Sequence, residues 1–507
     1  MLYILSLVVQ QIGTNFGEAI KLFLSGSISL VQLMERIKCA ALNGARESIR
    51  IALELKDTEL KMNRSNSLAI VNINRERTII TSIGSITYSR TLYKDRSTGK
   101  CIYLLDDYIG MPSHRQLTDD AVARVLQEVA YSSYYKAGKQ ASLDVSLGGT
   151  PVSKQTVHNI IHSLHFPPYK PPEKKRTVTY LFIEADEDHA HLQLIHTKGD
   201  VKRDPKTKRK NNGKMVKLVY VHEGYEEDPT HNHKCRIKNA HYFAGLYEGD
   251  EQNDVLWAEV WAYIEATYDI DSIESFNLGS DGGTWIQAGC EIIGMTFYLD
   301  GFHFVQKIAT IINILTDEEA KKQIKKELRQ AVIDNKIEEF TQKAEAVAKQ
   351  ASNDSRKNSA LDAKDFIVNN WDAARRRLNH PKEIVGCSTE AHVYHVLSYR
   401  LSTLPKGWSA KGLDNMARLR AFDFNGGNMY DLAVYQRTYE EESQADGKEG
   451  SSDIGPYSVR DLFRSEKSKH KYGKYYDNVR STVSPEIQST AWYQGLIGAS
   501  IFRQWRQ

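Results

Sequence analysis

Three acidic residues, far apart in the chain, have the surroundings that metal-dependent phosphoryl transfer requires. Asp186 lies within an apolar, alternating segment, and Asp281 stands at the end of another apolar segment and opens directly into two glycines. Glu390 falls in the first turn of a predicted helix. Three carboxylates can hold two Mg²⁺ (or Mn²⁺) ions, which activate a water or a 3′-hydroxyl and clamp a phosphate. We therefore predict Asp186, Asp281 and Glu390 as catalytic and metal-binding residues.

The run Phe182-Ile183-Glu184-Ala185-Asp186-Glu187-Asp188 alternates acidic and apolar residues. A strand with this pattern places Glu184, Asp186 and Asp188 on one face and turns its apolar residues toward a core. An acid in a buried strand is costly unless a cation or another partner compensates its charge. The alternative is that these acids lie at a fraying sheet edge.

His303 follows Asp300 by three residues, at the end of the next apolar run. A histidine beside an aromatic residue is often structural. In this setting it could instead contact the scissile phosphate or shape the acidic pocket, and we include His303 among the predicted catalytic residues.

The elements that would position these residues form an α/β domain over residues 177–402. Strands are predicted at 177–186, 190–196, 216–222, 273–278 and 292–299, with a helix at 254–268 between the third and fourth. This order suits an RNase H-like core. Residues 304–386 are charged and helical in pattern, which predicts an all-α insertion before the helix at 388–402.

The remainder of the chain divides by composition into further segments. The predicted boundaries are a helical region at 1–74, a small antiparallel β unit at 75–115, a helix-turn-helix-like region at 116–166, a proline-rich linker at 167–176 and a C-terminal extension at 403–507.

Two segments are predicted to contact DNA. Ser153 is expected to cap a second helix-turn-helix helix that presents Lys154, Gln155 and His158 to the groove. A basic loop between the second and third strands could follow phosphates through Lys202, Arg203, Lys208, Arg209 and Lys210. The alternatives are a plain helical hairpin for the first segment and a solvated loop for the second.

Bulk properties narrow the class of protein. The chain has 507 residues, a formal net charge of +3 and five widely spaced cysteines without a Cys-x-x-Cys pair. It has neither a signal-peptide pattern nor an apolar run of the ~18 residues that a membrane helix needs. These features predict a cytoplasmic protein with reduced thiols and no membrane partner. No Walker-type loop and no Gly-x-Ser-x-Gly is present, which argues against NTPase and acyl-hydrolase chemistry.

Seven ordered motifs resemble those of a known family. They are Glu-Ala-Asp at 184–186, Asp-Gly-x-x-Trp-Ile at 281–286, Leu-Asp-x-Phe-His at 299–303, Leu-Leu-Asp-Asp at 104–107, Ser-Lys-Gln-Thr-Val at 153–157, Trp-Ser-Ala-Lys-Gly at 408–412 and Asn-Met-Ala-Arg-Leu at 415–419. Together they resemble the ISLre-type bacterial insertion-sequence DDE transposases, long catalogued as an uncharacterised protein family. The Asp-x-x-His at 300–303 also resembles Mutator-like DDE enzymes. The chain departs from the usual family pattern at Glu187 and at Ser280 and Gly283, next to the acids.

The resemblance implies a DDE transposase of a mobile genetic element, with Asp186, Asp281 and Glu390 as its acids. Such an enzyme would cut element ends and transfer their 3′-hydroxyls to target DNA. Its partners would be double-stranded DNA, as terminal inverted repeats and target, and further copies of the chain in a homodimer or higher oligomer. Two alternatives stay open: an RNase H-like structure-specific nuclease and a catalytically inactive DNA-binding remnant.

Overall fold

The structure, a computed structural model, divides into two compact units. It describes residues 2–112, 115–143, 151–193, 212–227, 235–379, 388–404 and 406–445. One unit comprises the residues up to Phe166 together with a segment that starts at Gly427, and the other contains Pro167–Gly426. The division falls within the proline-rich segment, whose rings keep the backbone extended.

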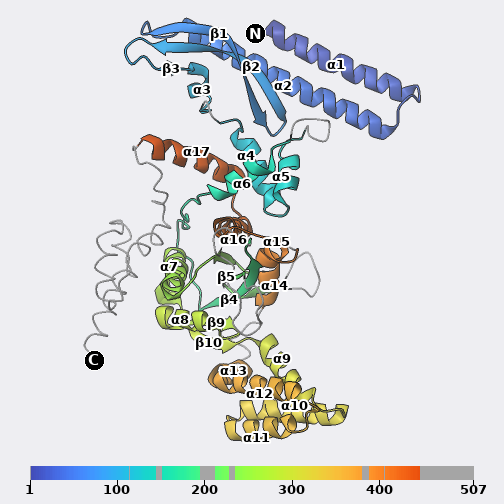
Figure 1. The fold of residues 1–507 in the computed structure, drawn as a ribbon, viewed down its shortest axis with the longest axis vertical. Coiled ribbons are helices and arrows are strands. Elements are labelled where there is room, and N and C mark those ends of the chain that lie inside the picture. Colours follow the sequence, from blue (N-terminus) through green and yellow to red (C-terminus); the bar gives the residue numbers. More distant parts are fainter. Residues whose placement is uncertain are drawn as a thin grey trace. The chain divides into compact units, whose positions relative to one another are not determined.

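The N-terminal unit begins with a helical hairpin and a three-stranded sheet (Figure 1). The hairpin consists of α1 (Leu2–Leu24) and α2 (Leu30–Met62), and a capping box between Ser29 and Gln32 starts α2. The antiparallel sheet contains β1 (Leu68–Thr81), β2 (Gly84–Asp95) and β3 (Cys101–Ile102). Because β1 pairs with β2 along nearly its whole length, the predicted boundary at residue 74 falls inside β1.

Four helices complete this unit. They are α4 (Asp119–Val129), α5 (Tyr134–Gln140), α6 (Lys154–His162) and α17 (Met429–Ala445), and α3 (Leu104–Tyr108) precedes them. As predicted, the Ser153 hydroxyl caps α6 by accepting the Thr156 N–H at 3.0 Å. Helix α17 packs against α4, with Arg437 Nε 3.1 Å from Asp119 Oδ2. The predicted C-terminal extension is thus divided, because its last described helix belongs to the N-terminal unit.

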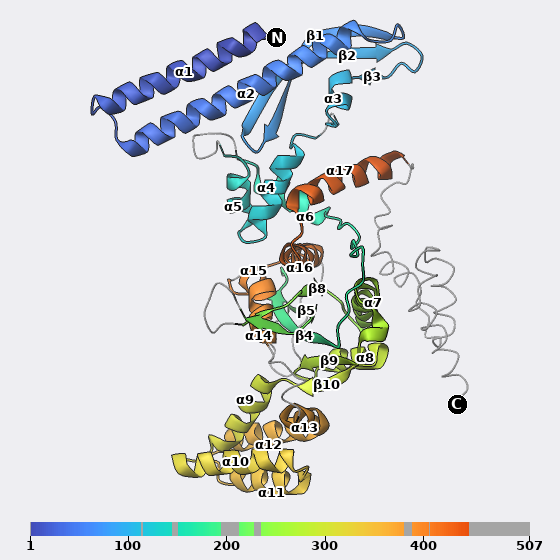
Figure 2. The same cartoon turned by 180° about the vertical axis from the view of Figure 1, so that it is seen from behind.

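The second unit contains a five-stranded mixed sheet (Figure 2). Its strands are β4 (Tyr180–His191), β5 (Gly213–His222), β8 (His241–Gly245), β9 (Ser275–Ser280) and β10 (Thr296–Leu299), in the spatial order β10-β9-β4-β5-β8. Strands β4, β9 and β10 run parallel, while β5 is antiparallel to both of its neighbours. A short hairpin of β6 (Tyr225–Glu227) and β7 (Cys235–Ile237) lies outside this sheet. The predicted α/β class is confirmed.

The sheet differs from the prediction in its second and third strands. Residues 190 and 191 belong to β4 and do not start a new strand, because β4 continues to His191 through Glu187, which pairs with Lys217 of β5. Pairing with β5 keeps these polar residues extended, and residues 194–196 of the predicted strand lie outside the described residues. The third strand is β8, which was not predicted.

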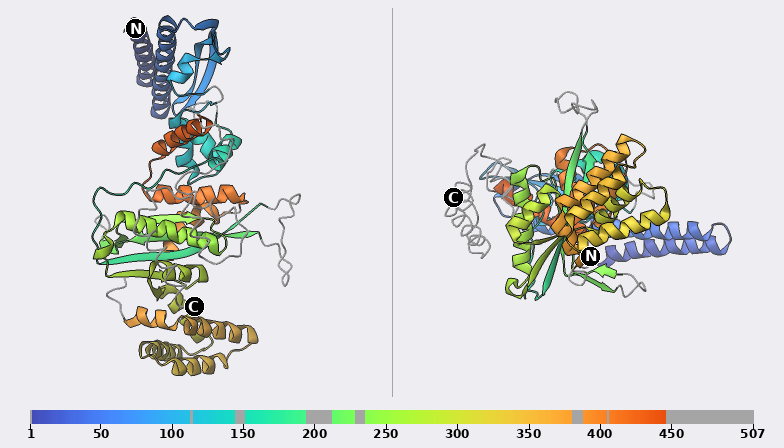
Figure 3. Two further views of the ribbon diagram at one scale, coloured as in Figure 1. Left: turned by 90° about the vertical axis from the view of Figure 1, so that its left-hand side faces the viewer. Right: turned by 90° about the horizontal axis from the view of Figure 1, so that it is seen from below.

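Helices cover both faces of the sheet (Figure 3). On one face α7 (Asp250–Thr267) and α8 (Thr284–Ile293) enclose a core with Leu181, Ile183 and Trp257. The apolar side of β4 therefore faces inward, as its alternation predicted. The other face carries α14 (Thr389–Val393), a π-helical turn (residues 394–398), α15 (Tyr399–Leu401) and α16 (Ala410–Phe424).

Five helices with a core of their own separate β10 from α14 along the chain. They are α9 (Gly301–Ile312), α10 (Glu318–Ile333), α11 (Ile337–Ala348), α12 (Asp354–Asn369) and α13 (Trp371–Asn379). Their core includes Phe304, Leu328 and Phe340. Helices thus occupy the region where the sequence predicted an insertion at about 304–386, and residues 380–387 lie outside the described residues. Among the helices described, none combines the length and apolar content needed to cross a bilayer.

The packing of α8 on α7 gives a test of this core. A Cβ at Gly289 would lie 2.3 Å from a ring carbon of Trp257, which is fully buried. We expect Gly289→Ala to lower the free energy of unfolding by about 1–3 kcal/mol, because the indole cannot move away without disturbing the core. Denaturant unfolding would measure it. Gly17→Ala on α1, where nothing lies within 4 Å, is the control and should be neutral or slightly stabilising. A neutral Gly289→Ala would contradict this packing.

Candidate active site

The parallel pairing of β4 with β9 brings two of the predicted acids level with each other. The paired residues run from Tyr180 with Ser275 to Glu184 with Gly279. Asp186 and Asp281 each lie two residues beyond this last pair, so the same register places them side by side at the carboxyl end of β9. The register of β4 and β9 therefore brings together two acids that are 95 residues apart in the sequence.

The turn after Asp281 depends on glycine. Gly282 has a φ of +91°, and a Cβ there would lie 2.7 Å from Oδ1 of Asn370, which caps the end of α12. The Gly283 N–H donates to Asp281 Oδ1 at 3.0 Å. A side chain at 282 would therefore strain the backbone that orients Asp281.

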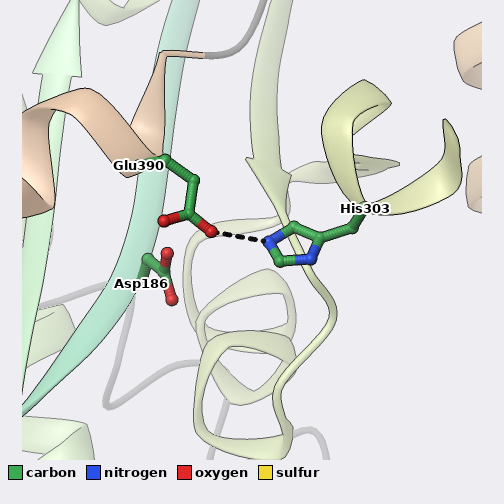
Figure 4. Close-up of side chains that lie close together, drawn as sticks. All are labelled: Asp186, His303 and Glu390. Carbon is green, nitrogen blue, oxygen red and sulfur yellow. Dashed lines mark ion pairs between the residues drawn. The ribbon is translucent and has the colours of Figure 1, made fainter. Parts of the chain in front are cut away.

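Asp186, His303 and Glu390 form a compact cluster (Figure 4). Each offers one potential ligand atom, and these three atoms lie within 4.8 Å of one another. His303 Nε2 lies 3.3 Å from Glu390 Oε1 and 3.9 Å from Asp300 Oδ2. Asp281 is not a member of this cluster, although its charge acts on Asp186. Glu390 is 55% exposed, so the cluster is accessible from solvent.

Burial and neighbouring charge act together on Asp186. The pKa of its carboxyl group is raised to about 7, mainly by removal from water and further by the negative charges of Asp281 and Glu390. The Glu187 N–H, 2.8 Å from Asp186 Oδ1, opposes the rise. The protein therefore does not fully compensate the negative charge around Asp186, and sites of this kind attract cations.

Glu184 connects the strand of Asp186 to the helix of Glu390. Its buried Oε2 accepts the Ser388 N–H at 3.1 Å, the Thr389 hydroxyl at 2.8 Å and the Tyr220 hydroxyl. His222 Nε2 lies 3.3 Å from Oε1. Burial alone would raise the pKa of Glu184, but His222 and these hydroxyl donors hold it below its ordinary value. The sequence placed Glu184 on the face of Asp186 but gave no sign that it anchors α14.

A buried arginine supports the same helix further along. The π-helical turn leaves backbone carbonyls without their usual helical partners. Arg420, only 1% exposed, donates from Nε to the carbonyl of Val396 at 2.9 Å and also bonds the carbonyl of His395. Helix α16 therefore stabilises the irregular turn that follows Glu390.

The donors present suit a hard divalent cation. Carboxylate oxygens are the ligands that Mg²⁺ prefers, and Mn²⁺ also accepts an imidazole nitrogen such as that of His303. The predicted ligand set was Asp186, Asp281 and Glu390. The structure brings Asp186 and Glu390 together with His303, and places Asp281 beside Asp186.

The predicted DNA-contact residues on α6 belong to the N-terminal unit. On α6, Lys154 and Gln155 are exposed, while the ring of His158 is partly buried and stacks on His162 at 3.8 Å. The basic run of Lys202, Arg203, Lys208, Arg209 and Lys210 lies outside the described residues.

Residues 24–438 match the model of an uncharacterised protein family, UPF0236. The chain belongs to this family. A UPF0236 protein of Caldanaerobacter subterraneus subsp. tengcongensis is 31% identical over 412 residues, which cover 81% of each chain. A second from that organism is 31% identical over 82% of this chain and 84% of its own length. The UPF0236 protein of the vanSb 3′ region of Streptococcus gallolyticus is 23% identical over 68% of this chain and 71% of its own. The UPF0236 match spans all the residues of the cluster.

The raised pKa of Asp186 predicts a stability change with pH. A carboxyl group whose pKa is higher in the folded state opposes folding once it is ionised, so its cost grows from about pH 4 and is complete above about pH 7. We expect Asp186→Asn to raise the free energy of unfolding by ~2 kcal/mol at pH 8, a figure discounted for partial exposure, and to have little effect at pH 4. Thermal unfolding across this pH range would measure the difference. Added Mg²⁺ should stabilise the wild type more than the variant, and a difference independent of pH would contradict the assignment.

The anchoring role of Glu184 predicts a large loss of stability. Glu184→Ala leaves two hydroxyls and the Ser388 N–H without their buried acceptor, and should cost ~3 kcal/mol in denaturant unfolding. Thr389→Val removes one donor and should cost ~1 kcal/mol. Because the pKa of Glu184 is lowered, the effect of Glu184→Ala should shrink as pH falls below about 4. Glu274→Ala, at an exposed position before β9, is the control.

Proposed function

We propose that this UPF0236 protein is a DDE transposase of a bacterial insertion sequence. It would cut element ends and join the freed 3′-hydroxyls to target DNA. The observation that carries the proposal is that Asp186, with Asp281 beside it and Glu390 close to it, lies at one end of a sheet. The three acids are separated by 95 and 109 residues along the chain.

The topology of the sheet supports the proposal. When the strands of the sheet are numbered in chain order, their spatial order is 5-4-1-2-3. Strand 2, which is β5, is antiparallel to both of its neighbours. An RNase H-like core would have this strand order, and in such a core acids on strands 1 and 4 would meet an acid on a later helix. In our proposal Asp186 on β4, Asp281 after β9 and Glu390 on α14 would take these positions, and helices α9–α13 would form the insertion of such a core.

The relatives add a second line of support. One Caldanaerobacter protein joins eleven locus designations in a single name, and another joins four. A protein encoded many times in one genome is what a mobile genetic element would leave. The resemblance of the seven sequence motifs to ISLre-type transposases points the same way.

The residues in and around the cluster would have different roles. Asp186, Asp281 and Glu390 would hold two Mg²⁺ or Mn²⁺ ions, which when bound supply Lewis acidity and an activated oxygen nucleophile. His303 would orient Glu390, from 3.3 Å, and face the scissile phosphate. Glu184 would fix the start of α14, and Gly282 would allow the turn that presents Asp281. No nucleophilic side chain is needed for this chemistry.

The remaining partners follow from the same proposal. Lys154, Gln155 and His158 on α6 would read terminal inverted repeats, and the basic run at 202–210 would contact phosphates. Processing two element ends calls for a homodimer or a higher oligomer, acting in the cytoplasm where chromosomal DNA is accessible.

The direct test is cleavage and joining by the purified full-length chain. The substrate is a plasmid carrying the coding sequence with its native flanks, incubated with Mg²⁺, and new 3′-ends and joined products are mapped by sequencing. Asp281→Asn should reduce both products by at least about 100-fold, since even outer-shell partners of metal ligands are worth ~10–100-fold, and DNA binding should be retained.

Asp188→Asn is the matched control. Asp188 lies on the same face of β4 but bonds Ser402 at 2.9 Å, away from the cluster, so its variant should stay active. Cleavage without joining of pre-cut ends would identify a nuclease instead. Loss of DNA binding in Asp281→Asn, with no cleavage by the wild type, would favour a non-catalytic DNA-binding protein.

A further inference from the structure

Two large aromatic side chains beside the carboxylate cluster are exposed to solvent. Phe302 directly precedes His303 in the first turn of α9 and is 56% exposed. Its ring meets that of His303 edge to face, with centroids 5.5 Å apart. The next turn of α9 adds Val305, which is 47% exposed.

The second aromatic residue comes from the helix of Glu390. Tyr394 follows Glu390 by four residues and therefore lies on the same helical face, one turn further along. It is 45% exposed, and its ring contacts that of Tyr399, which is 47% exposed, with centroids 6.4 Å apart. His303 and Glu390, which are ion-paired, thus each have an exposed ring within one helical turn.

Neither ring belongs to the buried core clusters among the described residues. Phe302 lies two residues before Phe304 and therefore on another face of α9, so Phe304 enters the core at 5% exposure while Phe302 stays outside it. The capping contact from the Phe302 N–H to Asp300 Oδ1, at 3.0 Å, fixes the backbone that presents it. An exposed apolar group next to a strongly polar site offers one ligand both an apolar and a polar contact.

A nucleotide has both characters, because its phosphate is charged and its base has an apolar face. We propose that Phe302 and Tyr394 stack on unpaired bases that flank the phosphate held at the cluster. The inference rests on the proposed function and deepens it: the strand at the site is single-stranded next to the reacting phosphate. Aromatic stacking accepts any base and is worth enough to hold a base out of a duplex.

The test uses the full-length protein and a single-stranded oligothymidylate that carries one 2-aminopurine, with Ca²⁺ in place of Mg²⁺. Stacking quenches 2-aminopurine fluorescence, so one titration reports affinity and ring contact. Phe302→Ala and Tyr394→Ala should each weaken binding about 5- to 150-fold and reduce quenching. Phe302→Trp and Tyr394→Phe keep a ring and should retain both.

Tyr180→Ala is the matched control. Tyr180 is 37% exposed at the start of β4, six residues before Asp186, and its loss should leave binding and quenching unchanged. Circular dichroism of each variant separates misfolding from loss of contact. As a second readout, an abasic nucleotide at the quenched position should make the wild type bind as weakly as the alanine variant whose ring stacks at that position.

The outcomes separate the two proposals. Alanine variants that bind and quench like the wild type would overturn the stacking role, as would a wild type that binds without quenching. If the wild type also cleaves and joins plasmid ends, the proposed function stands while the stacking proposal fails. If the wild type quenches through Phe302 yet never cleaves, the stacking proposal stands and the transposase proposal fails.

Discussion

The second unit must hold together the carboxylates of Asp186, Asp281 and Glu390, which repel one another and of which Asp186 is largely removed from water. The parallel register of β4 and β9 forces Asp186 and Asp281 to the same level, and α14 brings Glu390 toward them. Burial and each such approach raise the free energy of the ionised state, and together they raise the pKa of Asp186 to about 7. A fold that holds such charges together must be rigid enough to resist their separation, and the large aromatic core beneath β4 provides this rigidity.

A separate set of polar contacts keeps the third acid in place. Glu184 alternates with Asp186 on β4, yet the two carboxylates have opposite surroundings. Burial acts on both, but donors surround Glu184 and lower its pKa, whereas burial and the neighbouring acids raise the pKa of Asp186. One strand thus carries, two residues apart, a carboxylate whose charge the surrounding donors compensate and one whose charge they do not. Arg420 extends the support by binding the carbonyls of the π-helical turn after Glu390.

The sequence allowed much of this arrangement to be predicted, because its strongest signals are local. The alternation at 181–186 predicted the inward and outward faces of β4, Ser153 predicted the start of α6, and the periodicity after residue 304 predicted helices. The errors also have local causes. Glu187 and its polar neighbours concealed the continuation of β4, and β8 is short and lies in a segment rich in histidine and tyrosine.

Other features depended on pairing between distant segments, which a single sequence does not reveal. The role of Glu184 requires donors from residues 220, 388 and 389, and α17 packs on a helix more than 300 residues earlier in the chain. The closeness of His303 to Glu390 was likewise not encoded in any spacing. Asp186 and Asp281 lie side by side because the register of β4 and β9 pairs segments that are far apart in the sequence.

The long helical segment between β10 and α14 has a consequence for biosynthesis. During translation, Asp186 and Asp281 emerge well before Glu390, and five helices with a separate core must be made in between. A nascent chain, or a gene copy shortened by deletion before this point, carries two acids without the third and without the Ser388–Thr389 anchor for Glu184. The cluster of Asp186, His303 and Glu390 can therefore assemble only on a chain that has been synthesised past α14, so incomplete products cannot acquire it.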